Sequence, residues 1–137
     1  MKLAGVLRKA GDRFFRAYGL TQCQFNILMV LRYAAPSGCS QTELCRQLLV
    51  RGANMTALMR RLETRGLLRR ESDPGDERVW KVRISGKGRQ MLRRVEGTYY
   101  RKIDRIMQVH SEKDLERLSE QLCRTQEAVS REAVHEA

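Results

Sequence analysis

The sequence predicts a mainly α-helical fold that carries one small β-hairpin. Apolar residues recur every three or four positions over most of the chain, as they do along one face of a helix. Helix-capping patterns of the form S/T-x-x-E/Q begin at Thr21 and Ser40. Strict alternation appears after a strong turn signal, at Trp80, Val82 and Ile84. This change of period indicates a pair of strands.

The length and composition favour a single folded domain over residues 1–137. Hydrophobic residues make up 42% of the chain and charged residues 31%, which is typical of a globular domain with a charged surface. We find no apolar run near the ~20 residues that cross a bilayer and no secretion signal at the N-terminus. We therefore expect a cytoplasmic protein that does not enter the membrane.

Two helices are expected in the first part of the chain. Residues 1–18 carry apolar side chains at helical spacing, and Gly19 is expected to end that helix. The second helix begins at the Thr21 cap. Its body, residues 25–31, is apolar on nearly every side, so we expect it to be buried. Residues 35–38 have the composition of a loop.

Two shorter helices follow. Ser40 is expected to cap the third, whose apolar stripe is Leu44, Leu48 and Leu49. The fourth is expected to run from Ala53 to Arg65 and to end at Gly66, where a left-handed residue is needed. At about 100° per residue its inward face consists of Met55, Leu58, Met59 and Leu62.

The remaining elements are a hairpin and two long helices. The hairpin is expected over 67–84, because Asp73-Pro74-Gly75-Asp76 is a turn signal. Its single buried face would consist of Trp80, Val82 and Ile84. Ser85 is expected to cap a connecting helix over 85–107, and a last helix is expected over 111–137.

The positive charge is concentrated in the middle of the chain. The net charge of the whole chain is +11. Residues 51–94 hold 13 basic and 5 acidic residues, a net charge of +8, whereas residues 111–137 hold 4 and 7, a net charge of −3. A basic middle with an acidic end predicts a surface that binds a polyanion.

Two adjacent short helices followed by a hairpin form a winged helix-turn-helix, and its second helix would read DNA. The small side chains of Ala53 and Ala57 on the outward face would let the backbone approach the floor of the major groove. The same face holds Arg60 and Thr64, and Asn54, Thr56 and Arg61 lie on its flanks. Asn54 can pair with adenine, and Arg60 or Arg61 with guanine. We therefore interpret the segment 20–84 as a DNA-binding lobe.

The hairpin would supply a second contact. Arg78 beside its tip could enter the minor groove, and Asp76 could orient that guanidinium. Lys81 could contact phosphate, which adds affinity without sequence information. The predicted DNA-binding residues are Gln41, Arg51, Asn54, Thr56, Arg60, Arg61, Asp76, Arg78 and Lys81.

The chain resembles regulators of the MarR family over roughly residues 1–135. The resemblance rests on Leu20-Thr21-x-x-Gln24-Phe25, on Ala53-Asn54-Met55-Thr56 and the Arg61-Leu62-Glu63-x-x-Gly66-Leu67 run, and on Asp73-Pro74-x-Asp76-x-Arg78 with the following Val82-x-Ile84-Ser85. It implies a homodimer held by the helices 1–18 and 111–137. It also implies a repressor of a pseudo-palindromic double-stranded DNA site that is released by a small aromatic ligand.

The resemblance departs from the family pattern at two positions. Similar proteins often have Ser or Thr where this chain has Arg51, and Asp where it has Arg60. Both departures add positive charge where DNA would lie, so they are compatible with DNA binding. They do mean that the operator sequence of similar proteins does not transfer to this chain.

The resemblance also implies an effector cleft. Phe14, Tyr18, Met29 and Tyr33 could line such a cleft, and they are equally well explained as ordinary core residues. No cofactor is implied.

The four cysteines and two histidines leave other functions to be weighed. Cys23 lies at a capped helix start, where a thiol pKa can be lowered, so a redox-sensing repressor is an alternative, although each cysteine is more simply a small core residue. The cysteines show no metal-ligand spacing, and no catalytic motif is evident. We therefore expect that the chain is not an enzyme. An interaction module that binds no DNA is the remaining alternative.

Overall fold

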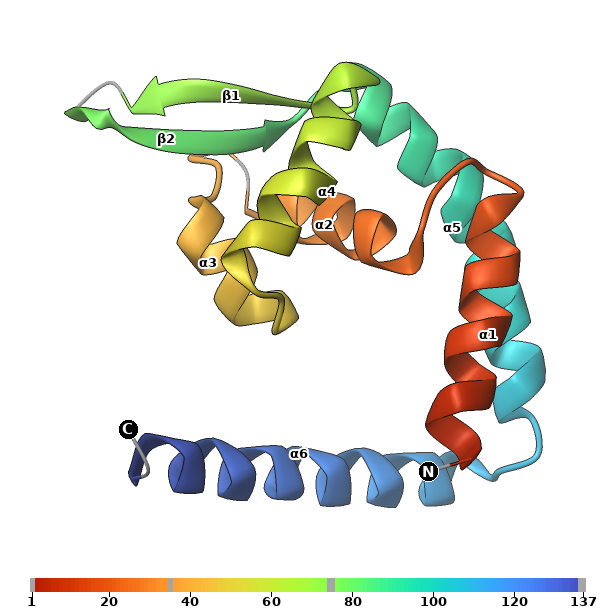
Figure 1. The fold of residues 1–137 in the computed structure, drawn as a ribbon. Coiled ribbons are helices and arrows are strands. Elements are labelled where there is room, and N and C mark those ends of the chain that lie inside the picture. The colour runs from red at the N-terminus through yellow and green to blue at the C-terminus, as the bar shows by residue number, and fades with distance from the viewer. Residues whose placement is uncertain (1, 35, 74–75, 136–137) are drawn as a thin grey trace. The chain divides into compact units, whose positions relative to one another are not determined.

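The computed structural model describes residues 2–34, 36–73 and 76–135, and among these it describes no side chains at 73, 76–79, 130 and 132–135. Helices dominate, with one hairpin near the middle of the chain (Figure 1). In chain order the elements are α1 (Lys2–Arg16), α2 (Gln22–Tyr33), α3 (Gln41–Leu48), α4 (Gly52–Thr64), β1 (Leu68–Asp73), β2 (Asp76–Ile84), α5 (Gly86–Met107) and α6 (Glu112–His135). The predicted fold class is confirmed.

The chain divides into two compact units, Met1–Glu96 and Gly97–Ala137, and α5 passes from one to the other. The first unit contains the hydrophobic core. Its buried side chains come from each of its helices and from both strands: Phe15, Leu20, Phe25, Ile27, Leu28, Leu31, Cys39, Leu44, Met55, Met59, Leu62, Leu67, Leu68, Val82, Ile84, Leu92 and Val95. Because α3, α4 and the hairpin share this core, packing fixes their positions relative to one another.

The predicted caps define where the helices begin and end. The Gln24 amide donates to Thr21 Oγ1 (3.2 Å) and the Thr21 amide to Gln24 Oε1 (3.0 Å), which is a complete capping box. Ser85 accepts from the Gly88 amide at 2.9 Å in the first turn of α5. Gly19 and Gly66 follow the ends of α1 and α4 with φ of +65° and +68°.

The strands pair antiparallel, with Leu68 opposite Ile84 and Arg70 opposite Val82. The loop before α3 pairs with β2, because the Cys39 amide donates to the Val82 oxygen (3.0 Å) and the Val82 amide donates to the Cys39 oxygen (2.8 Å). Val82 and Ile84 are buried as predicted. The prediction for Trp80 was wrong: its side chain is 59% exposed, because this part of β2 extends beyond the core-forming pairs.

The second unit contains the end of α5 and α6. The Asp114 amide donates to Ser111 Oγ at 3.2 Å, so Ser111 caps the start of α6. Apolar side chains are exposed along α6, at Leu118, Leu122 and Val129. Within the described part of the chain, none of the helices combines the length and the apolar character that crossing a bilayer would require.

Candidate nucleic-acid interface

The first helix of the candidate interface, α3, is short and firmly capped. Ser40 Oγ accepts from the Glu43 amide (3.2 Å), and the Glu43 carboxylate accepts from the Ser40 amide (2.6 Å). The hydrogen bond from the Ser40 backbone is the main reason that the pKa of Glu43 lies below its ordinary value. The cap therefore fixes the start of α3 just after the loop that is paired with β2.

The turn between α3 and α4 is built on a residue in the left-handed region. Leu49 ends α3 with φ 52° and ψ 41°, a conformation that is uncommon for a branched side chain. The predicted apolar stripe of α3 was wrong at this position, because Leu49 is 92% exposed while Leu44 is fully buried. The left-handed backbone turns the Leu49 side chain away from the core.

The next helix, α4, has a buried face and a basic exposed face. Met55, Met59 and Leu62 are completely buried, and Leu58 is half-buried. The outward face and its flanks were predicted correctly, because the residues predicted there are all exposed: Ala53, Ala57, Arg60 and Thr64 on the face, and Asn54, Thr56 and Arg61 on the flanks. Arg51 occupies the N-cap position without forming a side-chain cap and is also exposed. This face therefore presents to solvent the side chains that were predicted to read bases.

A hydrogen-bond network joins the two helices at this surface. Gln41 Nε2 donates to Thr56 Oγ1 (2.7 Å) and to the Gly52 oxygen (3.3 Å). Thr56 Oγ1 also donates to the Gly52 oxygen at 3.0 Å. The structure thus brings together Gln41 and Thr56, two of the residues predicted to bind DNA.

Two grooves of about 530 Å³ each border α4. One is lined by Cys23, Leu49, Val50, Arg51, Asn54, Ala57, Leu58 and Arg61. The other is lined by Arg16, Gly19, Leu20, Thr21, Gln24, Arg60, Arg61, Thr64 and Arg65. Sequence reasoning missed Arg16 and Arg65, which lie 49 positions apart in the chain. Arg65 is held beside this groove by a hydrogen bond that its guanidinium donates to the Gly19 oxygen, a contact that no sequence pattern records.

The hairpin carries the remaining predicted residues. Lys81 is half-buried on β2, opposite Glu71 of β1. The side chains of Asp76 and Arg78 lie outside the described residues, although the backbone of both belongs to β2. Their roles at the wing tip stay predictions.

The four residues proposed for an effector cleft have different surroundings. Phe14 and Tyr18 are half-buried neighbours with ring centroids 5.3 Å apart. Met29 is half-buried on α2. Tyr33 is 69% exposed and its ring lies 5.1 Å from the Arg32 guanidinium carbon. The cleft itself stays a prediction.

The cysteines differ in burial. Cys39 is buried, as a core residue would be, and burial raises its pKa to about 11. Cys23 and Cys123 are exposed and Cys45 is half-buried, so the interpretation of every cysteine as a core residue was wrong for the two exposed thiols.

Two helices joined by a tight turn, packed on a two-stranded wing, define a winged helix-turn-helix protein. Residues 18–79 match the family model described as MarR family. This match assigns the segment 18–79 to the MarR family.

Curated relatives support this assignment. The chain is 31% identical over 91 residues to the HTH-type transcriptional regulator PecS of Dickeya dadantii (strain 3937), an alignment that covers 66% of this chain and 55% of that protein. It is 27% identical over 103 residues to the HTH-type transcriptional repressor YetL of Bacillus subtilis (strain 168), which covers 75% of this chain and 62% of YetL. The aligned part thus spans little more than half of these relatives.

Solved structures share the fold over most of the chain. The S. aureus MepR–DNA complex matches with a TM-score of 0.82 at 17% identity, covering 93% of this chain and 91% of that one. The PcaV regulator of Streptomyces coelicolor, in complex with its natural ligand, matches with a TM-score of 0.77 at 21% identity and the same two coverages. At these identities the likeness establishes the fold.

Proposed function

We propose that this chain is a sequence-specific repressor that binds double-stranded DNA as a homodimer in the cytoplasm. The observation that carries the proposal is the exposed face of α4. Asn54, Arg60 and Arg61 are exposed there, while the opposite side of the same helix is buried in the core. A helix held in this way can enter the major groove without losing its own packing.

The side chains of this face suit base recognition. Arginine can donate two hydrogen bonds to guanine, and asparagine can pair with adenine. The Gln41–Thr56 bond supports the face from α3. We propose that Arg51 and Lys81 contact phosphates and that Arg78 enters the minor groove beside the wing, oriented by Asp76.

Exposed apolar residues at both ends of the chain support a homodimer. Leu3, Val6 and Leu7 are 70%, 61% and 50% exposed on α1. On α6, Leu122 and Val129 are 61% and 63% exposed. Long helices with such apolar stripes usually bury them against another chain, so we propose that the segments 1–18 and 111–137 form the dimer interface on a pseudo-palindromic site.

Release of the DNA by a small aromatic ligand is the regulatory part of the proposal. It is supported by the family and by structural relatives that hold ligands, PcaV among them. Phe14, Tyr18, Met29 and Tyr33 are the candidate contacts, because three of them are half-buried aromatic or methionine side chains of the first unit.

The experiment is selection of DNA fragments by the purified protein, followed by fluorescence anisotropy on the enriched sequence. Specific binding should be about 10³-fold or more tighter than binding to unrelated DNA, and should weaken steeply with added salt. Sedimentation should give a dimer. Equal affinity for all sequences, or binding that is independent of salt, would contradict the proposal and favour an interaction module.

A thiol-regulated repressor on the same scaffold is the second candidate. The observation in its favour is Cys23, which is exposed and lines the same groove as Asn54 and Arg61. Oxidation there would place a new polar group beside the base-reading residues. Mild peroxide should then reduce DNA affinity in the wild type and leave Cys23→Ser unaffected. Equal loss in both proteins would eliminate this mechanism.

A further inference from the structure

The turn between α3 and α4 places an apolar side chain in solvent. Leu49 is 92% exposed, the highest value among the large hydrophobic residues that the structure describes. Its φ of 52° is the only positive φ at a described residue other than glycine. A leucine at this position therefore gains nothing from burial and bears the steric cost of the left-handed region. Both features disfavour leucine here in the free chain.

The backbone of this turn does not need the Leu49 side chain. The amides of Leu49 and Val50 both donate to the Cys45 oxygen, the second at 3.1 Å. Helices commonly end with this pattern, and glycine usually occupies its left-handed position because it has no Cβ atom. The Met55 amide donates to the Arg51 oxygen at 3.0 Å and so begins the hydrogen bonding of α4. Main-chain bonds thus define the turn.

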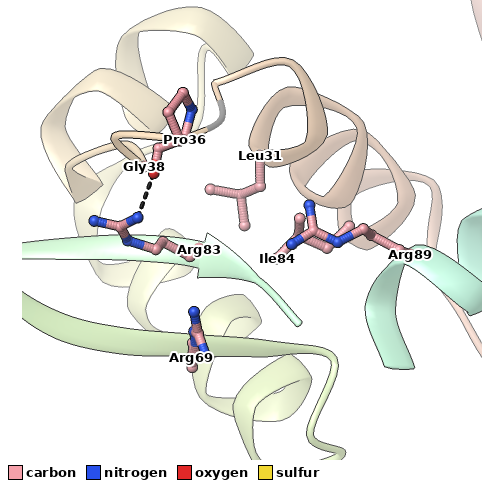
Figure 2. Close-up of a pocket in the computed structure, with 7 residues that line it drawn as sticks. All are labelled: Leu31, Pro36, Gly38, Arg69, Arg83, Ile84 and Arg89. Atoms are coloured by element: carbon pink, nitrogen blue, oxygen red, sulfur yellow. Dashed lines mark hydrogen bonds between the residues drawn. The ribbon is translucent and has the colours of Figure 1, made fainter. Parts of the chain in front are cut away.

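The helix that carries this turn is held at its other end by the base of the hairpin. The Arg83 guanidinium donates to the Pro36 oxygen in the loop before α3 (Figure 2). This bond lies at a small cavity of about 230 Å³, lined by Leu31, Pro36, Gly38, Arg69, Arg83, Ile84 and Arg89. The turn itself lies at the end of α3 and α4 that is away from the hairpin (Figure 1). Packed elements therefore present Leu49 in a fixed position.

The groove that Leu49 lines combines apolar and basic side chains. Val50 and Ala57 add to its apolar part, and Arg51 and Arg61 carry its charge. Among the described residues that line it, none is acidic. This charge favours a polyanion as the occupant over another apolar surface. DNA is a polyanion that also offers apolar groups, because each thymine presents a C5-methyl group in the major groove.

We infer that Leu49 contacts the methyl group of a thymine in the operator and so contributes to sequence specificity. A recognition helix contacts base edges with its N-terminal residues, and Leu49 precedes Arg51, the N-cap of α4, by two positions. Asn54 lines the same groove and is proposed to pair with adenine, so an A·T pair there would carry a thymine methyl close to Leu49. The contact is one part of the proposed DNA interface and rests on the proposed function.

Uracil in place of thymine removes only this methyl group, so a uracil scan of the selected operator tests the contact. In fluorescence anisotropy, wild type should bind about fourfold more weakly when uracil replaces thymine at one position of each half-site. Leu49→Gly should bind the unmodified operator about fourfold more weakly and should lose nothing further at that position. Leu49→Met, which keeps an apolar side chain of similar volume, is the matched control and should retain the sensitivity to uracil.

Thermal melting separates the contact from an effect on folding. Glycine removes the steric cost of the left-handed region but gives the unfolded chain more freedom. These effects oppose each other, so the melting temperatures of Leu49→Gly and wild type should agree within about 4 °C. A much lower melting temperature of Leu49→Gly would show that the side chain supports the fold and would overturn the contact.

The remaining outcomes distinguish this contact from the proposed function. Equal sensitivity of wild type and Leu49→Gly to uracil at every position would overturn the methyl contact. Unchanged operator affinity of Leu49→Gly would also overturn it, and would leave a second copy of the chain or another protein as the occupant of the groove. In both cases wild type still binds the selected operator, so the proposed function stands. Wild type that prefers no DNA sequence would overturn the proposed function, and the Leu49 contact with it.

Discussion

Gln41 Nε2 donates a hydrogen bond to Thr56 Oγ1 at 2.7 Å, which joins the first residue of α3 to the fifth residue of α4. The same nitrogen lies 3.3 Å from the Gly52 oxygen. Since Gly52 is the first residue of α4, this contact holds the start of the helix that presents Asn54. The orientation of the exposed face of α4 thus depends on the hydrogen bonds of Gln41 at the surface as well as on the core beneath the helix.

Gln41→Ala should therefore weaken specific DNA binding more than it weakens folding. A lost hydrogen bond at an exposed site costs about 0.5–1.5 kcal/mol of binding free energy when it orients a recognition element, while stability should change by about 0.5 kcal/mol or less. Anisotropy titration and thermal melting measure the two effects. Gln47→Ala, an exposed glutamine of α3, is the control. Equal affinities of the two variants would contradict a positioning role for Gln41.

Arg60→Ala should lower specific affinity because Arg60 is exposed in the middle of the α4 face. If the guanidinium pairs with a base, the loss is about 1–3 kcal/mol and specificity relaxes at one operator position. Footprinting and affinity on single-base variants of the operator measure this. Arg93→Ala removes an exposed arginine of α5 and serves as the charge-matched control. An unchanged footprint with unchanged affinity would refute the role of Arg60.

The regular elements were predictable because local chemistry determines them. The Thr21 and Ser40 capping boxes, and the glycines after α1 and α4, are short-range features that can be read from neighbouring residues. The outward face of α4 follows from its periodicity in the same way.

The errors have a different physical origin. Leu49 is exposed because its left-handed backbone breaks the helical periodicity that placed it on the α3 stripe. Trp80 keeps the strand alternation but lies where β2 has left the core. Arg16 and Arg65 line the same groove beside α4, and Arg69 and Arg89 line the same cavity at the hairpin base. Tertiary packing brings each pair together. No sequence pattern records such contacts.

Gly88→Ala should destabilise the protein, because a Cβ atom at Gly88 would lie 2.1 Å from the Leu67 oxygen and 2.8 Å from Ile84 Cγ1. The nearest atom is backbone and cannot rotate away, so we expect a loss of about 1–3 kcal/mol in the free energy of unfolding. Denaturant titration measures it. Gly86→Ala is the control, since a Cβ atom there meets nothing within 4 Å. Equal stabilities of the two variants would show that α5 moves freely from the hairpin base.

Glu43 should make stability depend on acidic pH. The Ser40 backbone hydrogen bond holds the pKa of Glu43 below its ordinary value of 4.5, so the folded state favours the carboxylate. The resulting stabilisation is present at neutral pH and is lost as the pH falls through the lowered pKa.

Glu43→Gln should therefore be less stable than wild type near neutral pH and should lose less stability between about pH 5 and pH 3. Urea titration at several pH values measures both curves. Parallel curves would show that the Glu43 carboxylate contributes nothing to the pH dependence. Ser40→Ala tests the other half of the cap and should cost about 1 kcal/mol at neutral pH.

In the first unit, Cys39 is buried and Cys23 is exposed. We expect the two thiols to differ correspondingly in reactivity. Cys39 is 3% exposed, and desolvation, reinforced by the nearby Glu43 carboxylate, raises its pKa to about 11. Because the thiolate is the reactive form, only about 1 in 1,000 molecules would be ionised at Cys39 near pH 8. Cys23 is exposed. Iodoacetamide at that pH should therefore label Cys23 in the native protein and Cys39 only after urea is added, as peptide mass spectrometry would show. Native labelling of Cys39 at the rate of Cys23 would mean that the Cys39–Val82 pairing opens readily, and that the hairpin base is less firmly held than its hydrogen bonds indicate.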